Sequence, residues 1–452
     1  SISNIEKHKK CLIIAVDCGS NSLEELKYAK TNDIDVIVID HHRMSVISED
    51  AIIINPHRPD EKEDYRYLCA SGLVFICIVG VNRLLREMKF YSSELVEPDL
   101  MDYTDLTALA TVCDVVSLVG LNRAFVSTGM KVIRQRKNFG IDALLSDHRG
   151  TCINSETISF FLGPKLNASG RMASSDLSVR LLTTKNPIEA RKIAQQLDDL
   201  NKKRQNLELE IMEEAVSSLE ERQGNFICLY NADWHVGIIG IIAGRLREKY
   251  NKPSIIISRD ANGIGKASCR SIEDVDISDV IRKGVEQGII ISGGGHSMAA
   301  GFLIDISKID DLMGFLSSNI KYNCIPQKLC ADCLLPLDMI SLDLLDSISI
   351  LEPFGMGNQQ PRFVIPDVNV VSSRIVGNNH VGFTILDEKG NSLRAISFRS
   401  VGTELGDILL KEEVCSASLL GTLILSSWGG QNYVNFRLED ISSHSFGVNK
   451  NE

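Results

Sequence analysis

Three absences restrict what this chain can be. No apolar run approaches the roughly 20 residues that a membrane-spanning helix needs, which excludes an integral helical membrane protein. There are twelve cysteines, but Cys330 and Cys333 are the only close pair, and a structural zinc site uses four ligands. Positive charge is also scarce: 48 Lys and Arg against 59 Asp and Glu give a net charge of −11, which argues against coating of nucleic acid by bulk electrostatics.

The residues that are present indicate a large intracellular protein. The cysteines are scattered through apparent strands and helices, where a thiol serves as a small buried hydrophobe, so we expect a reducing cytoplasm. The chain has 452 residues, of which 44% are hydrophobic, and can therefore bury several cores. Its length predicts about three domains.

One short motif, Asp40-His41-His42, carries the clearest chemical information. It follows the apolar run 36–39, which is typical of a buried parallel strand, and open α/β sheets bind ligands beyond the carboxyl ends of their strands. Carboxylate oxygen together with imidazole nitrogen suits a divalent ion such as Mn²⁺. The alternative is that Asp40 caps the next helix while the histidines are merely solvated.

Two further acids favour the metal interpretation. The apolar run 11–16 ends at Asp17, and apolar residues at helical spacing in 22–32 predict a β-α-β unit. The right-handed crossover of such a unit brings Asp17 and Asp40 to the same edge of one sheet. Asp114 follows a helical-looking stretch and is either a third metal ligand or an ordinary acid at a helix end. Three converging acids and a histidine pair suggest two-metal hydrolysis of a phosphodiester.

Several ordered blocks of the sequence resemble the DHH phosphoesterases. In the first half these blocks are VDCG at 16–19, DHH at 40–42, ASGLVF at 70–75, TVCDVV at 111–116 and LGPKLNASGR at 162–171. Further on, WHVGIIG at 234–240, GKASCRS at 265–271 and GGGHSMAAG at 293–301 resemble the associated substrate domain. LEPFGMGN at 351–358 resembles a block found in the exonucleases among these phosphoesterases. The order and number of the blocks point to the RecJ family of single-strand-specific DNA exonucleases.

The resemblance implies an activity, a cofactor and a set of partners. It implies 5′-to-3′ removal of nucleotides from single-stranded DNA in repair and recombination, with Mn²⁺ or Mg²⁺, by a monomer that works with a helicase or a single-strand-binding protein. It also implies that Asp17, Asp40 and Asp114 bind metal. His41 and His42 would complete the ligand set or position the attacking water.

One departure from the family concerns the amino terminus. The first motif of the family, an Asp-x-Asp after the first strand, should precede Asp17, but only sixteen residues do so, and the chain begins with Ser1. We therefore expect an amino-terminally incomplete member whose two-metal site lacks ligands. The activity of such a chain would be weak or absent.

Phosphate recognition is expected in residues 223–327, the DHH-associated substrate-binding domain. The helix predicted at 238–246 follows a turn, and its amino end could hold a phosphate. The glycine run 293–295 is a second candidate for a phosphate-binding loop. The plainer alternatives are a glycine-rich loop and solvated arginines. The resemblance assigns substrate binding to Arg171, His235, Ser268, Arg270 and His296.

The rest of the pattern predicts the domain organisation. Residues 1–186 alternate strands and helical segments, as in a parallel-sheet α/β domain, and 187–222 form one connecting amphipathic helix about 50 Å long. Residues 328–452 contain five apparent strands, which predicts a small antiparallel barrel, an OB-fold that binds nucleic acid. Trp428 and Tyr433 are the candidates there for base stacking.

Two other functions stay open at this point. Smaller DHH enzymes cleave short oligoribonucleotides or cyclic dinucleotides with similar first and second domains, but they lack the long connecting helix and the terminal barrel. A catalytically degenerate member would bind single strands, or a repair partner, without cutting. The preference for DNA and the 5′ polarity rest on the resemblance alone.

Overall fold

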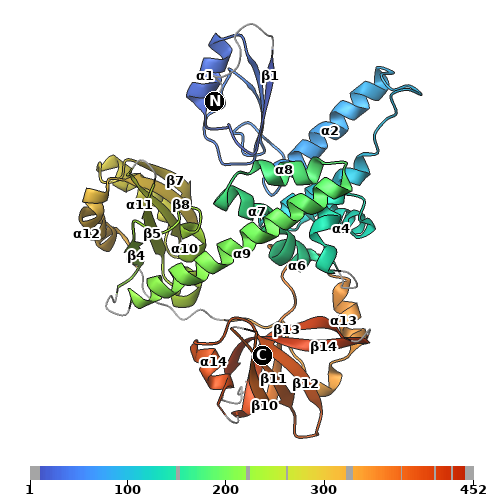
Figure 1. Cartoon of the computed structure of the whole chain (residues 1–452), viewed down its shortest axis with the longest axis vertical. Helices are drawn as coiled ribbons and strands as arrows, with labels where there is room; N and C mark the ends of the chain where they lie inside the picture. Colours follow the sequence, from blue (N-terminus) through green and yellow to red (C-terminus); the bar gives the residue numbers. More distant parts are fainter. Residues whose placement is uncertain are drawn as a thin grey trace. The chain divides into compact units, whose positions relative to one another are not determined.

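The computed structural model describes residues 11–148, 153–219, 224–260, 263–321, 329–377, 379–411, 414–428 and 431–442. The chain divides into two compact units, the first made of residues 1–137, 148–160 and 328–452, the second of 138–147 and 161–327 (Figure 1). Residues 161–186, which the sequence assigned to the first domain, pack within the second unit. The predicted borders at 222 and 327 stay predictions. No helix in the described ranges is both long and apolar enough to cross a membrane.

A three-stranded parallel sheet in the order β1-β2-β3 opens the first unit. Its strands are Leu12–Val16, Asp35–Ile39 and Ile52–Ile54, and helix α1 (Leu23–Thr31) joins β1 to β2. Leu26 and Ala29 of α1 are buried with Val36 and Val38 of β2. The β-α-β unit expected from the two apolar runs is confirmed.

Helices follow this sheet. They are α2 (Ala70–Glu87), α3 (Thr104–Cys113), α4 (Gly120–Gln135) and the single turn α6 (Ser155–Thr157), with short 3₁₀ turns at Leu100–Tyr103 and Ser146–His148 and a π turn at Ile158–Leu162. Helix α3 packs against both α2 and α4, and Asp114 is its C-cap residue.

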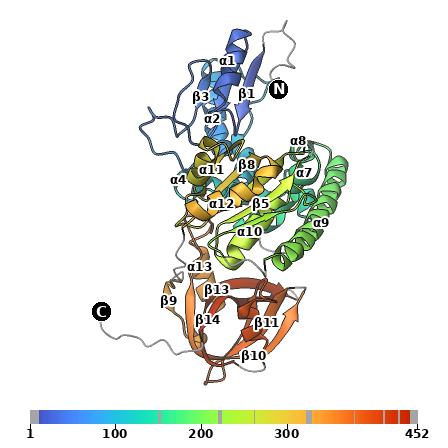
Figure 2. The ribbon, with the colours of Figure 1, turned by 90° about the vertical axis from the view of Figure 1, so that its left-hand side faces the viewer.

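The carboxyl-terminal part of the first unit is a closed barrel, as predicted. Its strands are β10 (Phe363–Val376), β11 (His380–Leu386), β12 (Ser392–Ser397), β13 (Val414–Trp428) and β14 (Gln431–Ser442), with helices α13 (Leu342–Ser349) and α14 (Glu404–Leu409) and the short strand β9 (Cys333–Leu334). The strand order 11-12-14-13-10 closes because β10 also pairs with β11 (Figure 2). Phe436, Leu419 and Leu423 are fully buried in its core.

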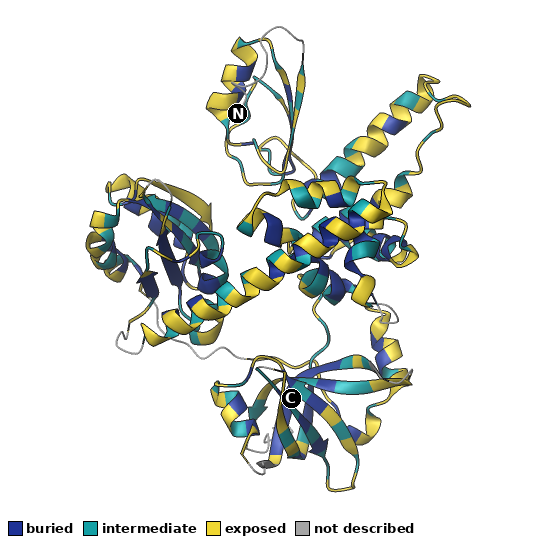
Figure 3. Cartoon of the chain, in the orientation of Figure 1, coloured by how far each residue is buried: buried dark blue, intermediate teal, exposed yellow. Residues whose placement is uncertain are grey.

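A long helix dominates the second unit. Helix α9 spans Pro187–Ser217 and buries one face, which includes Ile193, Leu197 and Ile211 (Figure 3). The sequence predicted this helix to residue 222, and residues 220–222 lie outside the described ranges. Three short helices share its unit: α5 (Phe139–Leu144), α7 (Gly163–Met172) and α8 (Asp176–Thr183).

The second unit also contains a five-stranded mixed sheet in the order β4-β5-β6-β8-β7. The strands are β4 (Ile227–Tyr230), β5 (Ser254–Arg259), β6 (Gly265–Arg270), β7 (Ser292–His296) and β8 (Ala299–Ile304), and the helices are α10 (Ile239–Tyr250), α11 (Ile277–Glu286) and α12 (Ile309–Asn319). Helix α10 packs on β5 and β6, whereas α11 packs on β7 and β8.

Candidate functional site

Polar residues gather at the carboxyl edge of the parallel sheet. Val16 pairs with Ile39, and Ile39 pairs with Ile54, so the next residue of each strand comes at the same edge. These residues are Asp17, Asp40 and Asn55. The sequence predicted this position for the two acids. The physical reason is that parallel strands in register end together, at the edge where α/β sheets bind their ligands.

Asp40 is buried and holds the loop that follows it. Its Oδ2 accepts from the Ser20 N–H (3.1 Å), and its Oδ1 accepts from the His41 N–H (2.8 Å) and from Nδ1 of His42 (2.7 Å). Burial would raise the pKa of Asp40, but the hydrogen bonds from His42 and Ser20 outweigh it and lower the pKa to about 2. An ionised Asp40 favours the Nδ1–H tautomer of His42, because its Oδ1 can then accept from that nitrogen.

Three side chains offer ligand atoms close enough together for one metal ion: Asp17, His41 and His42, whose donor atoms all lie within 4.8 Å of one another. Nε2 of His41 lies 3.2 Å from Oδ1 of Asp17 and 3.4 Å from Oδ2 of Asp114. Asp114, at the carboxyl end of α3, therefore faces the same imidazole, and its role as a metal ligand stays a prediction. This mixture of carboxylate and imidazole donors fits Mn²⁺.

The electrostatics of this cluster favour a cation. The hydrogen bond to Asp17 raises the pKa of His41 above its usual value, burial opposes this, and the charges of Asp114, Asp17 and Asp40 raise it further. Burial, together with the charge of Asp17, raises the pKa of Asp114. The carboxylates are thus crowded around one imidazole, and a divalent cation would relieve their repulsion.

Sequence reasoning missed two residues that support the cluster. Asn55 is buried and donates from Nδ2 to Oγ of Ser20 (2.8 Å) and to the carbonyl of His42 (2.9 Å). Ser20 is also buried and donates its N–H to Asp40. Asn55 could have been found by the signal that identified Asp17 and Asp40, because it too directly follows an apolar strand.

In the second unit, Arg171 lies beside the Trp234-His235 turn. Its guanidinium donates from Nη1 to the carbonyl of Gly237 (3.3 Å), and the Gly237 N–H donates to Nδ1 of His235 (3.1 Å). A Cβ atom at Gly237 would lie 2.2 Å from the carbonyl oxygen of Arg171, so glycine is required here for close approach. The structure therefore brings together Arg171 and His235, which are 64 positions apart in the sequence.

Ser268 and Arg270 lie on β6 and His296 lies on β7, the two strands that flank β8 in the mixed sheet. Arg270 of β6 and His296 of β7 both pair with Ala299 of β8, so their side chains project from the same face. Nη1 of Arg270 donates to the carbonyl of Cys269 (2.8 Å) and approaches Oγ of Ser268 (3.5 Å). The five predicted substrate-binding residues thus belong to one unit, with His296 two strands away from Arg270.

The barrel carries a pocket of about 520 Å³ lined by residues of all five of its long strands. Arg374 and Arg394 line it, and neither has an ion-pair partner among the described residues. Phe398 adds a ring that is 48% exposed. Of the predicted stacking residues, Tyr433 is 39% exposed and donates its hydroxyl to Gln431 (2.7 Å), whereas the side chain of Trp428 lies outside what the structure describes.

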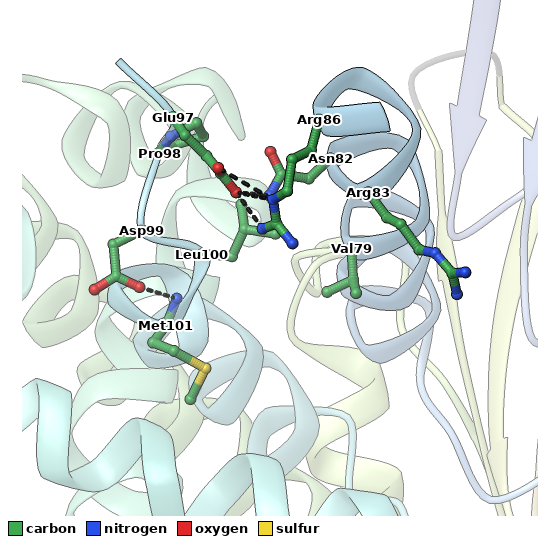
Figure 4. A pocket seen from close by; sticks show the side chains of 9 residues that line it. All are labelled: Val79, Asn82, Arg83, Arg86, Glu97, Pro98, Asp99, Leu100 and Met101. Carbon is green, nitrogen blue, oxygen red and sulfur yellow. Dashed lines mark hydrogen bonds and ion pairs between the residues drawn. The ribbon is translucent and has the colours of Figure 1, made fainter. Parts of the chain in front are cut away.

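A second pocket, of about 570 Å³, lies between α2 and residues 97–101 (Figure 4). Arg86 forms an ion pair with Glu97 at its wall, and Asp99 accepts the Met101 N–H (3.0 Å). None of the residues predicted to be functional lines this pocket, and its acidic and basic groups compensate one another.

Comparison with known proteins identifies relatives of each part of the chain. A family model of the DHH N-terminal domain matches residues 2–111, one of the DHHA1 domain matches 223–321, and one of the RecJ OB domain matches 331–440. The single-stranded-DNA-specific exonuclease RecJ of Haemophilus influenzae is 30% identical over 421 residues, which cover 89% of this chain and 73% of that protein.

Other relatives are longer than this chain. The RecJ exonuclease of Bacillus subtilis is 27% identical over 97% of the chain, and the chain spans 55% of that protein. The crystal structure of RecJ in complex with Mn²⁺ from Thermus thermophilus matches with a TM-score of 0.78 at 25% identity, over 95% of this chain and 61% of that one. A structure of exonuclease RecJ bound to manganese matches at 27% identity, over 68% of the chain, with a TM-score of 0.56.

Proposed function

This chain belongs to the family of RecJ single-stranded-DNA-specific exonucleases, and on that basis we propose that it hydrolyses single-stranded DNA from the 5′ end. The observation that carries the proposal is the cluster of Asp17, His41 and His42, faced by Asp114, at the carboxyl edge of a parallel sheet. The RecJ OB match at 331–440 favours this function over that of the smaller DHH enzymes, which lack the barrel.

We propose Mn²⁺ or Mg²⁺ as the cofactor, because related RecJ structures are complexes with these ions and the donor set here fits them. Asp17, His41, His42 and Asp114 would hold the metal. When bound, such ions lower the pKa of a coordinated water and stabilise charge on a phosphodiester, in a two-metal arrangement. Asp40 positions His42 through the 2.7 Å hydrogen bond. Direct ligation by Asp40, which the sequence predicted, stays a prediction.

The chain's other residues bind and orient the DNA. Arg171, Ser268 and Arg270 would hold the terminal phosphate, for which the arginine fork is suited, and His235 and His296 would contact the adjacent backbone. The barrel pocket, with Arg374 and Arg394 beside Phe398, would bind the single strand by charge and stacking; Trp428 and Tyr433 remain the stacking residues predicted from sequence.

The same proposal includes the cellular setting. We place the activity in DNA repair and recombination, in a reducing cytoplasm, with a monomeric enzyme that acts after a helicase or with a single-strand-binding protein. Cys69, Cys77 and Cys113 are thiols, which agrees with that compartment.

Metal binding and nuclease activity test the proposal separately. Calorimetric titration with Mn²⁺ should show a site that His41→Ala removes and that Asp35→Asn, at the opposite end of β2, leaves intact. Single strands labelled at the 5′ end should lose the label as a mononucleotide. Mn²⁺ binding that survives in His41→Ala, or release of nucleotides from the 3′ end alone, would contradict the proposal.

The role of Asp40 has its own control. If Asp40 acts through His42, Asp40→Asn weakens Mn²⁺ binding by about 10- to 100-fold, and the double variant with His42→Ala is no worse than His42→Ala alone. If the two substitutions add, Asp40 is a ligand in its own right.

A further inference from the structure

Several arginines of the second unit act on one another electrostatically, with Glu208 and Glu248 beside some of them. Burial lowers the pKa of Arg171, and the charges of Arg204 and Arg270 lower it further. Burial likewise lowers the pKa of Arg270, and the charge of Arg247 adds to this. Arg204 is compensated, because its Nη1 lies 2.6 Å from Oε2 of Glu208. Arg171 also has the charge of Glu208 nearby, and Arg247 forms only a long ion pair with Glu248.

Arg247 lies on a face of α10 that leads away from the predicted phosphate contacts. Gly240, Gly244 and Arg247 are spaced four and three residues apart, so they share one face of the helix. A Cβ atom at Gly240 would lie 3.0 Å from Oγ of Ser268 and 3.6 Å from Nη2 of Arg270. One at Gly244 would meet nothing within 4 Å. This face of α10 thus contacts Ser268 and Arg270 at Gly240, and at Gly244, on the way to Arg247, no other atoms cover it.

The hydrogen-bonding capacity of Arg247 is incompletely used. Its Nε is buried without a hydrogen-bond partner among the described residues, and its Nη2 lies 3.6 Å from Oε1 of Glu248, beyond hydrogen-bond distance. The side chain is 35% exposed, so it remains accessible. Because Nε is buried, the accessible remainder of the guanidinium is the part that would bind a phosphate oxygen. Neighbouring Arg245, by contrast, is paired with Glu208 (3.0 Å).

We propose that Arg247 binds a second phosphate of the substrate strand, adjacent to the phosphate held by Ser268 and Arg270. This inference rests on the proposed function and specifies its substrate as a strand of at least two phosphates. A mononucleotide product carries only one phosphate, so it lacks the contact with Arg247 and dissociates more readily than the strand. The site would therefore distinguish polymer from product through Arg247.

The test measures binding of a 5′-phosphorylated thymidine dodecamer to the full chain by fluorescence anisotropy, with a chelator present to prevent cleavage. Arg247→Gln should weaken binding about tenfold, should reduce the slope of log affinity against log salt by about 0.7, and should leave binding of thymidine 5′-monophosphate unchanged. Arg282→Gln is the matched control, because Arg282 is an exposed arginine of the same unit, paired with Asp279 and Glu286.

Neutral linkages locate the second phosphate. A methylphosphonate at one linkage near the 5′ end should weaken binding of the unmodified protein but not of Arg247→Gln, whereas substitutions at other linkages should affect both equally. Arg247→Lys, which keeps the charge, should retain part of the effect, and circular dichroism should show all variants folded. Additive effects at every linkage, or an unchanged salt slope, would overturn the inference.

The failure of this inference differs from that of the proposed function. If the unmodified chain binds the dodecamer and Arg247→Gln binds it equally well, only the role of Arg247 is wrong. If the unmodified chain binds no single strand, the proposed function fails and the inference falls with it.

Discussion

The carboxylate of Asp40 illustrates how one residue can serve folding and function together. It is 1% exposed, yet ionised, because the groups around it donate hydrogen bonds to both of its oxygens. A lowered pKa of about 2, against an ordinary 3.8, means that the folded state binds this proton less readily than the unfolded state. The contribution of Asp40 to stability is therefore full above about pH 4 and is lost as the pH falls toward 2.

We predict that Asp40→Asn destabilises the first unit by about 2 kcal/mol at pH 7, since each pKa unit corresponds to about 1.4 kcal/mol. Urea unfolding measured at pH 7 and again between pH 4 and pH 3 should show that the difference from the unmodified chain shrinks in acid. Asp35→Asn, an exposed acid on the same strand, should change stability by less than about 0.5 kcal/mol. A difference that stays constant with pH would count against the ionised carboxylate.

The raised pKa of His41 leads us to expect that metal binding depends on pH. Its pKa is raised by Asp17 and the other nearby acids, so the imidazole keeps its proton above pH 6.5, and this proton competes with the metal. The affinity for Mn²⁺ should rise as the pH increases from 6 to 8. Calorimetry in buffers of different ionisation enthalpy would detect the released proton. An affinity that is flat over this range would show that His41 is not a ligand.

At the scale of secondary-structure elements, the junction of α7 with the turn before α10 depends on a close backbone contact. Gly237 leaves room for the carbonyl of Arg171, and the carbonyl of Gly237 accepts a hydrogen bond from the Arg171 guanidinium. Gly244, in the middle of α10, faces open space instead. The two glycines therefore have opposite expected responses to an added methyl group.

Gly237→Ala should destabilise the second unit by about 1–3 kcal/mol, the usual cost of overpacking, and should weaken binding of single-stranded DNA because Arg171 is displaced. Gly244→Ala should stabilise the chain by about 0.5–1 kcal/mol through helix propensity. Thermal unfolding of the full chain measures both effects. Equal stability of the two variants would show that the space at Gly237 is not limiting.

At the scale of the whole molecule, the two kinds of site lie in different units. The acid and histidine cluster belongs to the first unit, and the arginine group belongs to the second. A ligand stabilises the part of a protein that binds it, so Mn²⁺ should protect the first unit. Single-stranded DNA, which we propose to contact both the arginine group and the barrel pocket, should protect both units.

We predict that Mn²⁺ at 100 times its dissociation constant adds about 2.7 kcal/mol to the free energy of unfolding of the first unit. Hydrogen exchange should then slow in β1, β2 and α3 but not in β6 or α10. His41→Ala should abolish this protection. Protection by Mn²⁺ that is confined to the second unit would place the metal elsewhere.

Much of this protein can be inferred from short stretches of sequence, because strands and helices have local periodicities. Apolar runs that end in an acid identified β1 and β2, and parallel register then placed Asp17 and Asp40 at one edge. The same reasoning located the long helix, which ends at Ser217, and the strands of the barrel. These features depend on neighbouring residues and on the fixed geometry of strands and helices.

The detailed roles of side chains required the folded chain. Asp17 and Asp40 look alike in the sequence, yet Asp17 offers a ligand oxygen whereas both oxygens of Asp40 accept hydrogen bonds, one of them from Ser20, 20 positions away. Arg247 carries no motif, and two of its features arise from the packing of α10 on β6: an Nε without a partner among the described residues and an electrostatic influence on Arg270. Periodicity encodes which face of an element is buried, but distances between remote side chains are set only when the elements pack.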